Sequence, residues 1–533
     1  MIGHATPYVL RCGAGEQTSY THQTSLHIKV PIADHDLLLP LFDSQNCQHK
    51  FDELATDPRF RFFGNVCIGN STSPLPGGPS YTYPDALHLP LTSLYPYYNT
   101  LLFSYGSSHS TPLPNTPGSS ASSDRLENVF PALAFVNWYN GHPAYTHLAP
   151  DLSGETVTVV GHGNVAVDCA RILLKPPSEF VGTDMPTPII EHLKKSRVKR
   201  VEVVGRRGPA QVAFTTKEFR EMVNLEGIRY QPVKGEMMDQ AKEMVKGDRA
   251  RTRLLDLMAK GGKVKSSSTS TTTTTMSEEK EFQLGFLRSP KAFLSDPTRP
   301  GKVGSVRWAR NALLAQPSVP QGPAPDPPAA PPSERPASSS VLARPTGEEY
   351  AAPTGMIIES VGYRGEPIWE GEAGQGETGG VPFDRARARV MNLEGRVTDG
   401  SGVMVSRTLI DLARGRRTNA VIIVHSQIPG MYTAGWIASG PIGVIASTMQ
   451  RAYAVASTIL TDHYQSAPLG ASSILCPEPQ LGGTPDFITS STRRVVDLND
   501  WKRIDEAEVE RGVAQGKPRE KFVSIREMLK VLD

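Results

Sequence analysis

Two glycines and an alanine separate a short apolar run from a helix-like run in the stretch "VTVVGHGNVAVDCARIL" (157–173). Gly161 permits a tight turn, Gly163 lets a phosphate group approach the backbone, and Ala166 lets the helix pack close to the strand. The free amides and the positive dipole at the start of such a helix attract an anion. Strand, turn and helix in this order predict a pyrophosphate-binding turn, and an ordinary βα turn is the competing interpretation.

Two arginines, Arg206 and Arg207, end the next predicted strand, "RVKRVEVVGRRG" (197–208). An acidic residue at this place usually binds the ribose hydroxyl of NAD, whereas a guanidinium pair suits the 2′-phosphate of NADP. The arginines lie farther from the glycine turn than the roughly 20 residues of the usual motif, and we interpret residues 175–196 as an insertion. The pattern predicts NADPH. The alternative is a pair of solvated charges at a strand end.

A second informative stretch is "AGWIASGPIGVIASTM" (434–449), in which a loop with a tryptophan leads into a helix. The amides at the start of that helix could face a ligand. The indole of Trp436 could stack on a flat ring system. From these residues alone, a flavin-facing loop and a buried turn around a packed tryptophan are both open.

Composition excludes several other classes of protein. The 56 basic and 54 acidic residues give a net charge of +2, so no overall field favours nucleic acid. The five cysteines are scattered without a C-x-x-C pair, which argues against a disulfide framework, a zinc site or a dithiol redox centre. No apolar run approaches the roughly 20 residues of a membrane helix. Residues 1–60 have no regular pattern, and we expect low-complexity insertions at 266–276 and 316–346.

Several strings together closely resemble adrenodoxin reductase, the mitochondrial NADPH:ferredoxin oxidoreductase family. They are "GHGNVAVDCARILL", "VVGRRGPAQVAFTTKEFREM", "ESVGY", "GWIASGPIGVIASTM" and the tail with "GKPREK". The resemblance implies an α/β fold of two nested, Rossmann-like, three-layer domains. A discontinuous FAD domain would span 61–148 and 359–533, and an NADP domain inserted into it would span 149–358.

The resemblance also implies roles for individual residues, each of which has a plainer interpretation as a core or solvated residue. Those assigned to NADP are His162, Gly163, Asn164, Val165, Arg206, Arg207, Glu218 and Gly443. Those assigned to FAD are Val66, Ile68, Trp436, Gly443, Val444 and Ile445. Asp151 is a weak candidate near the flavin, and we expect neither an acid–base triad nor a metal site.

The implied activity is electron transfer from NADPH through FAD to a 2Fe–2S ferredoxin, one electron at a time. The resemblance places the acidic ferredoxin on a basic face, for which Arg249, Arg251 and Arg253 in "DRARTRLLDL" are the candidates. A solvated helix face is the alternative for these arginines. A location in the mitochondrial matrix or at the inner membrane is implied by the family alone.

The chain departs from the family at its start. The family's own G-x-G-P-A-G turn for FAD is missing, and "CGAGEQTS" offers Gly13 and Gly15 with Thr18 in the third position, which we interpret as a loop. The segment 405–427 looks inserted. These departures leave one alternative function, an NADPH-binding remnant that lacks a complete FAD site.

Overall fold

The computed structural model describes residues 57, 60–69, 83–261, 280–315, 341–368, 380–411, 416–442, 445–465, 475–476, 485, 488 and 490–533. The expected irregular segment 1–60 and the insertion 266–276 therefore lie almost wholly outside the described residues. The insertion predicted at 316–346 lies outside them up to residue 340, and its last residues begin a strand. In the described part of the chain, no helix combines the length and the apolar character that a membrane crossing requires.

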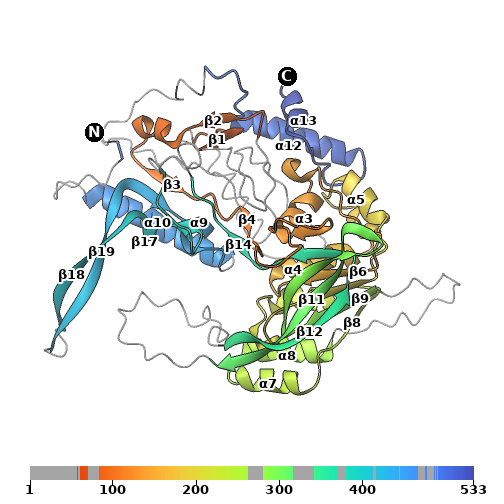
Figure 1. Ribbon diagram of the computed structural model, residues 1–533. Coiled ribbons are helices and arrows are strands. Elements are labelled where there is room, and N and C mark those ends of the chain that lie inside the picture. Colours follow the sequence, from red (N-terminus) through yellow and green to blue (C-terminus); the bar gives the residue numbers. More distant parts are fainter. Residues whose placement is uncertain are drawn as a thin grey trace.

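A six-stranded parallel sheet, which we call the central sheet, lies in the lower right part of the molecule in Figure 1, where β6, β8 and β9 are labelled. Its order is β5-β13-β6-β7-β9-β8. The strands are β5 (Val129–Pro131), β13 (Met356–Glu359), β6 (Thr156–Val160), β7 (Arg200–Val204), β9 (Lys280–Gly285) and β8 (Ile228–Tyr230). The predicted strand before Gly161 is β6, and the one before the arginine pair is β7. The register pairs Val160 with Val204, so both predicted motifs leave the same edge of the sheet.

Strands β6, β7 and β13 bury apolar residues at successive positions (Val159–Val160, Val203–Val204 and Ile357–Ile358) because both faces of the sheet are covered there. On one face, Val159, Val203 and Ile358 pack into the helical core. On the other, Val160 and Val204 pack against Trp308 of a three-stranded antiparallel sheet. That sheet consists of β10 (Arg288–Asp296), β11 (Arg299–Ala315) and β12 (Val341–Pro353). Helices, parallel sheet and antiparallel sheet make the three layers that the sequence predicted.

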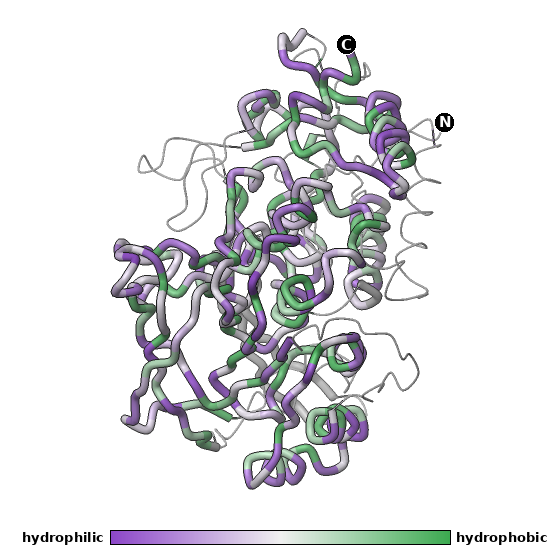
Figure 2. The backbone as a smooth tube through the Cα atoms, turned by 90° about the vertical axis from the view of Figure 1, so that its right-hand side faces the viewer, coloured by the Kyte–Doolittle hydropathy of each residue, from purple (hydrophilic) through white to green (hydrophobic). Residues whose placement is uncertain are grey.

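Hydrophilic and hydrophobic stretches alternate along the backbone in Figure 2. The helices around the sheet are amphipathic, except for the helix that follows β5, in which all eight residues are buried. They are α3 (Ala132–Tyr139), α4 (Asn164–Leu174), α5 (Thr187–Lys194), α6 (Thr216–Val223), α7 (Glu236–Met244) and α8 (Arg249–Lys260). The long interval between the glycine turn and the arginine pair contains the 3-10 helix η3 (Pro177–Phe180) and α5. Structured elements thus occupy the interval that we interpreted as an insertion.

A second group of strands lies outside the six-stranded sheet. It consists of β1 (Val66–Ile68), β2 (Leu87–Leu89), β3 (Leu101–Phe103), β4 (His109–Ser110), β14 (Tyr363–Arg364), β15 (Phe383–Asp384), β16 (Arg389–Val390), β17 (Asn392–Leu393), β18 (Arg396–Asp411) and β19 (Arg416–Thr433). A shared hydrophobic cluster joins segments far apart in sequence, with Leu101, Val397 and Ile437 among its members. The parallel pairing of Met431 with Leu101 extends this connection.

The described residues of the segment 405–427, which looks inserted in the sequence, belong to the hairpin of β18 and β19. This hairpin projects from the body of the molecule (Figure 1). After β19 the chain continues into α9 (Trp436–Ser439) and α10 (Ile445–Gln465). The last helices in sequence order are α12 (Leu498–Val513) and α13 (Ile525–Lys530). The predicted domain boundary at residue 149 falls after β5, although β5 already pairs with β13 in the central sheet.

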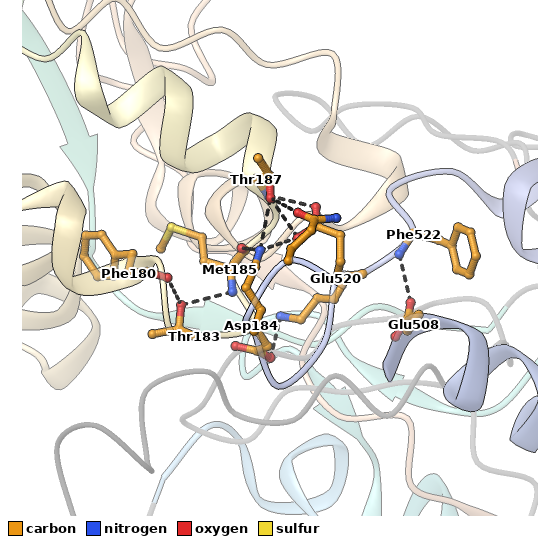
Figure 3. A network of polar contacts seen from close by, with 11 residues as sticks. Phe180, Thr183, Asp184, Met185, Thr187, Glu508, Glu520 and Phe522 are labelled. Carbon is orange, nitrogen blue, oxygen red and sulfur yellow. Dashed lines mark hydrogen bonds and ion pairs between the residues drawn. The ribbon is translucent and has the colours of Figure 1, made fainter. Parts of the chain in front are cut away.

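A buried charged network fastens the loop after α12 to the turn before α5 (Figure 3). The ammonium of Lys521 lies 2.9 Å from a carboxylate oxygen of Asp184, and both side chains are almost fully buried. Glu520 accepts a hydrogen bond from the Thr187 amide (2.9 Å) at the start of α5 and pairs with Lys517. Each charge in such a buried network needs an opposite charge beside it, because a buried charge without one lowers the stability of the fold.

Removing one member of this network tests its contribution to stability. We expect Lys521→Met to destabilise the protein by roughly 3–5 kcal/mol, because Asp184 keeps a buried charge without its cation. The double variant K521M/D184L should recover much of that loss, since the remaining site is apolar. Denaturant unfolding measures both. A single variant as stable as the natural protein would contradict the assignment.

Candidate functional site

The turn after β6 is built around a close approach of two backbones. The Gly161 amide donates to the carbonyl of Val204 (2.7 Å), and the Ser360 amide donates to the carbonyl of Val160 (2.7 Å). A Cβ on Gly161 would lie 1.9 Å from the Ser360 oxygen, and φ is +127°, so only glycine fits. A Cβ on Gly163 would meet nothing within 4 Å. The space over Gly163, at the start of α4, is therefore open for a phosphate.

The loop after β7 is latched onto this turn by hydrogen bonds. The amides of Ala213 and Phe214 donate to the His162 carbonyl at 2.8 and 3.0 Å. The Asn164 side-chain oxygen accepts from the Thr215 amide (2.8 Å). Asn164, predicted to contact the pyrophosphate, thus positions the start of α6 with its carbonyl oxygen. Val165 lies half-buried in the first turn of α4.

The imidazole of His162 points into the domain. It packs against Phe286 with ring centroids 4.8 Å apart, and Nε2 lies 3.0 Å from the Val203 carbonyl oxygen. Burial, together with the charges of Arg288 and Arg207, lowers the pKa of His162 to about 4. The ring is neutral at pH 7. The resemblance places His162 at the pyrophosphate, and the structure places only its backbone at the turn.

The predicted arginine pair stands at the same edge of the sheet as the glycine turn. Arg206 is exposed and Arg207 is half-buried. The carbonyl of Arg206 accepts from the Asn311 side chain (3.0 Å), which fixes the loop on β11. Burial lowers the pKa of Arg207, and the positive charges of Arg206 and Arg251 add to that effect. The loop thus gathers positive charge beside the opening over Gly163.

Glu218 is half-buried in the first turn of α6, where the Thr215 hydroxyl accepts from its amide (3.3 Å). Its carboxylate pairs with the buried Arg171 of α4 (2.9 Å), which also pairs with Asp168 (3.2 Å). Burial raises the pKa of Glu221, a third carboxylate near Arg171, although the guanidinium lowers it. Glu218 is therefore part of a partly buried network of ion pairs around Arg171. It is not the solvated helix charge of the alternative interpretation.

Trp436 begins α9 and is buried, with 4% of its surface exposed. Its indole stacks on Tyr363 at a centroid distance of 6.0 Å, and its Nε1 finds no hydrogen-bond acceptor among the described residues. Gly435 and Gly440, with positive φ on either side of α9, would each present a Cβ to open space. Gly443 and Val444 lie outside the described residues, and Ile445 is the first residue of α10.

Tyr363 packs on the tryptophan of α9 and lies within electrostatic reach of the helix that follows the glycine turn. It belongs to β14, which pairs with β4. Burial raises the pKa of its phenol, and the neighbouring Cys169 and Asp168 of α4 raise it further. Tyr363 belongs to the string "ESVGY", and the sequence predicted no role for it. The sequence feature that could have indicated a role is its position, since Tyr363 directly follows a glycine turn after a strand that ends beside Gly161.

Other predicted residues have structural surroundings of their own. Val66 is a buried residue of β1, with 3% of its surface exposed, and Ile68 is half-buried against the 91–105 region. These positions favour the core interpretation for Val66. Asp151 lies in a turn and pairs with Lys302 and with Arg299 (3.7 Å) of β11. The described contacts of Asp151 do not include Trp436 or Tyr363.

The arginines predicted as one ferredoxin-binding patch fall on two sides of α8. Arg249 and Arg253 are exposed, whereas Arg251 is half-buried. Residues four apart share a helix face and residues two apart do not. The structure therefore brings two of the three together and separates Arg251 from them.

The chain matches no protein-family model, but curated proteins match it over most of its length. The mitochondrial NADPH:adrenodoxin oxidoreductase of Drosophila melanogaster is 34% identical, covering 91% of this chain and 82% of the relative. That of Mus musculus is 32% identical, covering 99% and 92%. The chain belongs to the NADPH:adrenodoxin oxidoreductase family. It is thus an oxidoreductase, as its sequence predicted.

A solved structure supports the same family and fold. Mycobacterium tuberculosis FprA in complex with NADPH is 26% identical, with a TM-score of 0.67, and the match covers 95% of this chain and 89% of that one. The Rossmann-like α/β fold predicted for this member of the NADPH:adrenodoxin oxidoreductase family is confirmed.

The two turn glycines make a matched pair of test sites. We expect Gly163→Ala to fold with stability close to that of the natural protein, because its Cβ enters open space, and to bind NADPH at least about tenfold more weakly because the methyl occupies the phosphate approach. Gly161→Ala should lose several kcal/mol of stability, roughly as for other strained backbone positions. Thermal unfolding and NADPH titration measure the two effects. Equal affinity in G163A and the natural protein would place the phosphates elsewhere.

His162 should make stability depend on pH. Its pKa is depressed from 6.5 to about 4 in the folded state, so its stabilising contribution is full above pH 6.5 and is lost as the pH falls toward 4. The difference in unfolding free energy between the natural protein and His162→Gln should shrink by about 3 kcal/mol at most over that range. Chemical denaturation from pH 7.5 to 4.5 tests this. A constant difference would mean that the ring titrates normally.

Proposed function

We propose that this chain transfers electrons from NADPH through FAD to a 2Fe–2S ferredoxin, one electron at a time, in the mitochondrion. The observation that carries the proposal is Tyr363. It stacks on Trp436 and lies within electrostatic reach of Asp168 in α4, the helix that begins at the glycine turn. A nicotinamide reaching from the turn and a flavin beside the indole would therefore meet around Tyr363. The printed names of the relatives, NADPH:adrenodoxin oxidoreductase, support both the donor and the type of acceptor.

The NADP half of the site fits its cofactor. The open space over Gly163 and the amides that begin α4 suit a pyrophosphate, and Arg206 and Arg207 suit a 2′-phosphate. Glu218 would approach the nicotinamide end, with Arg171 fixing the position of its carboxylate.

The described part of the flavin half fits FAD as well. The Trp436 indole N–H is buried and has no acceptor among the described residues, and the same holds for the hydroxyls of Ser107 and Ser108 before β4. Buried polar groups of this kind are normally satisfied, so a ligand with acceptor atoms would complete them. When bound, FAD supplies hydride acceptance and the release of electrons one at a time. Trp436 and Tyr363 would orient the ring system and exclude water.

The domain division remains part of the proposal. We propose that the FAD domain comprises 61–148 and 359–533 and that the NADP domain, 149–358, is inserted into it. The shared cluster of Leu101, Val397 and Ile437 supports a discontinuous first domain. The pairing of β5 with β13 favours an earlier start for the NADP domain, near residue 129.

Two exposed arginines carry the proposed ferredoxin contact. Arg249 and Arg253 lie four residues apart on α8, and both are exposed. An acidic partner would be attracted to such a face, mainly through faster association at low salt. The proposed mitochondrial location follows from the names of the relatives.

The function is tested with purified protein, a plant or vertebrate 2Fe–2S ferredoxin and cytochrome c as final acceptor. We expect about one FAD per chain and ferredoxin-dependent reduction. The double variant R249E/R253E should raise the ferredoxin KM about tenfold while leaving the reduction of ferricyanide by NADPH unaffected. Lys195→Glu, a charge reversal at an exposed site after α5, is the control. Colourless protein that binds NADPH would instead support the remnant without a complete FAD site.

A further inference from the structure

Arg251 differs from the two arginines beside it in where it points. Its Nη1 donates to the carbonyl of Val212 at 2.7 Å, and this contact holds the side chain against the body of the domain. Asp248 caps α8 by accepting from the Arg251 amide (3.0 Å), which fixes the first turn of the helix. Arg249 and Arg253 leave the helix on the other side, into solvent.

The loop that Arg251 contacts is the loop of the arginine pair. After Arg207 the chain forms the 3-10 helix η4 (Pro209–Gln211), in which the Gln211 side chain accepts from the Gly208 amide (3.1 Å). Val212 follows directly and is almost fully buried. Because α8 packs against η4, Arg251 keeps a fixed place relative to Arg207.

The positive charge of Arg251 acts electrostatically on Arg207. Burial is the main cause of the lowered pKa of Arg207, and Arg206 and Arg251 are the two charges that add to it. Elsewhere in the domain the arginines are paired with carboxylates. The buried Arg171 pairs with Asp168 and Glu218, and the half-buried Arg288 pairs with Glu202. Arg206 and Arg251 thus both repel Arg207, and a doubly charged anion bound beside Arg207 would relieve that repulsion.

We propose that Arg251 is a third guanidinium of the 2′-phosphate site and helps to select NADPH over NADH. It is then separate in function from Arg249 and Arg253, which face a protein partner. The inference rests on the NADPH half of the proposed function and is independent of the flavin half.

The test uses 2′,5′-ADP and 5′-AMP as ligands of the full chain, with affinities measured by calorimetry. We expect Arg251→Gln to weaken 2′,5′-ADP about tenfold or more and to leave 5′-AMP unchanged, because only the former carries the 2′-phosphate. Lys260→Gln, at the exposed end of the same helix, is the matched control and should change neither. Protein purified without flavin still allows this titration, so failure of the FAD proposal and failure of this one are distinguishable.

A second variant guards against a folding effect, since Arg251→Gln also alters the bond to Val212. Arg251→Lys keeps the positive charge and should retain most of the affinity for 2′,5′-ADP, with thermal unfolding of each variant as a check. Unchanged 2′,5′-ADP affinity in both variants would overturn the proposal. A raised ferredoxin KM in R251Q with normal nucleotide affinity would overturn it as well, and would return Arg251 to the protein-binding face.

Discussion

The close approach of the Gly161 backbone to the Ser360 carbonyl is the constraint on which the site depends. It joins the carboxyl ends of β6 and β13, which are neighbours in the sheet and far apart in sequence. On one side the chain turns outward past Gly163 into α4. On the other it continues from Ser360 to Tyr363 and the Trp436 loop. In open α/β sheets, ligands bind where connections from adjacent strands diverge, and this contact creates such a point.

The protein treats its arginines in two ways around this point. Arg171 is buried among carboxylates and holds Glu218 beside α4, and Arg288 is paired with Glu202. These guanidinium groups are neutralised and serve the scaffold. Arg207 instead has a pKa lowered by burial and, beyond that, by the positive charges of Arg206 and Arg251. Positive charge left in excess at one place in the sheet edge is what an anionic cofactor requires.

Local patterns predicted the local part of this site. Strand, glycine turn and helix follow one another within 157–173, and the arginine pair follows directly on a strand, so both motifs could be read from neighbouring residues. Side-chain directions were less predictable. Whether the His162 ring faces a phosphate or Phe286 depends on Gly205, which leaves room for the ring and belongs to the next strand's end. The separation of Arg251 from Arg253 was available from helical spacing. That Arg251 turns toward the loop of the arginine pair follows only from the structure, in which its side chain bonds to the Val212 carbonyl.

Long-range pairing was beyond the sequence. β5 joins the central sheet by pairing with β13, and the last residues of the segment 316–346 begin β12 of the antiparallel sheet. Neither could be predicted, because the partners of these segments come from distant parts of the chain. The same holds for the buried pair of Lys521 and Asp184. Such contacts depend on the packing of the whole fold, so no local sequence pattern predicts them.

The central claim is that the arginine-bearing turn delivers NADPH to a flavin beside Trp436. Anaerobic titration of the purified protein, followed through the visible absorption band of oxidised flavin, tests it most directly. The account predicts that NADPH bleaches the band stoichiometrically and that NADH at the same concentration reacts far more slowly. Protein that binds NADPH while the flavin band stays unchanged would contradict it.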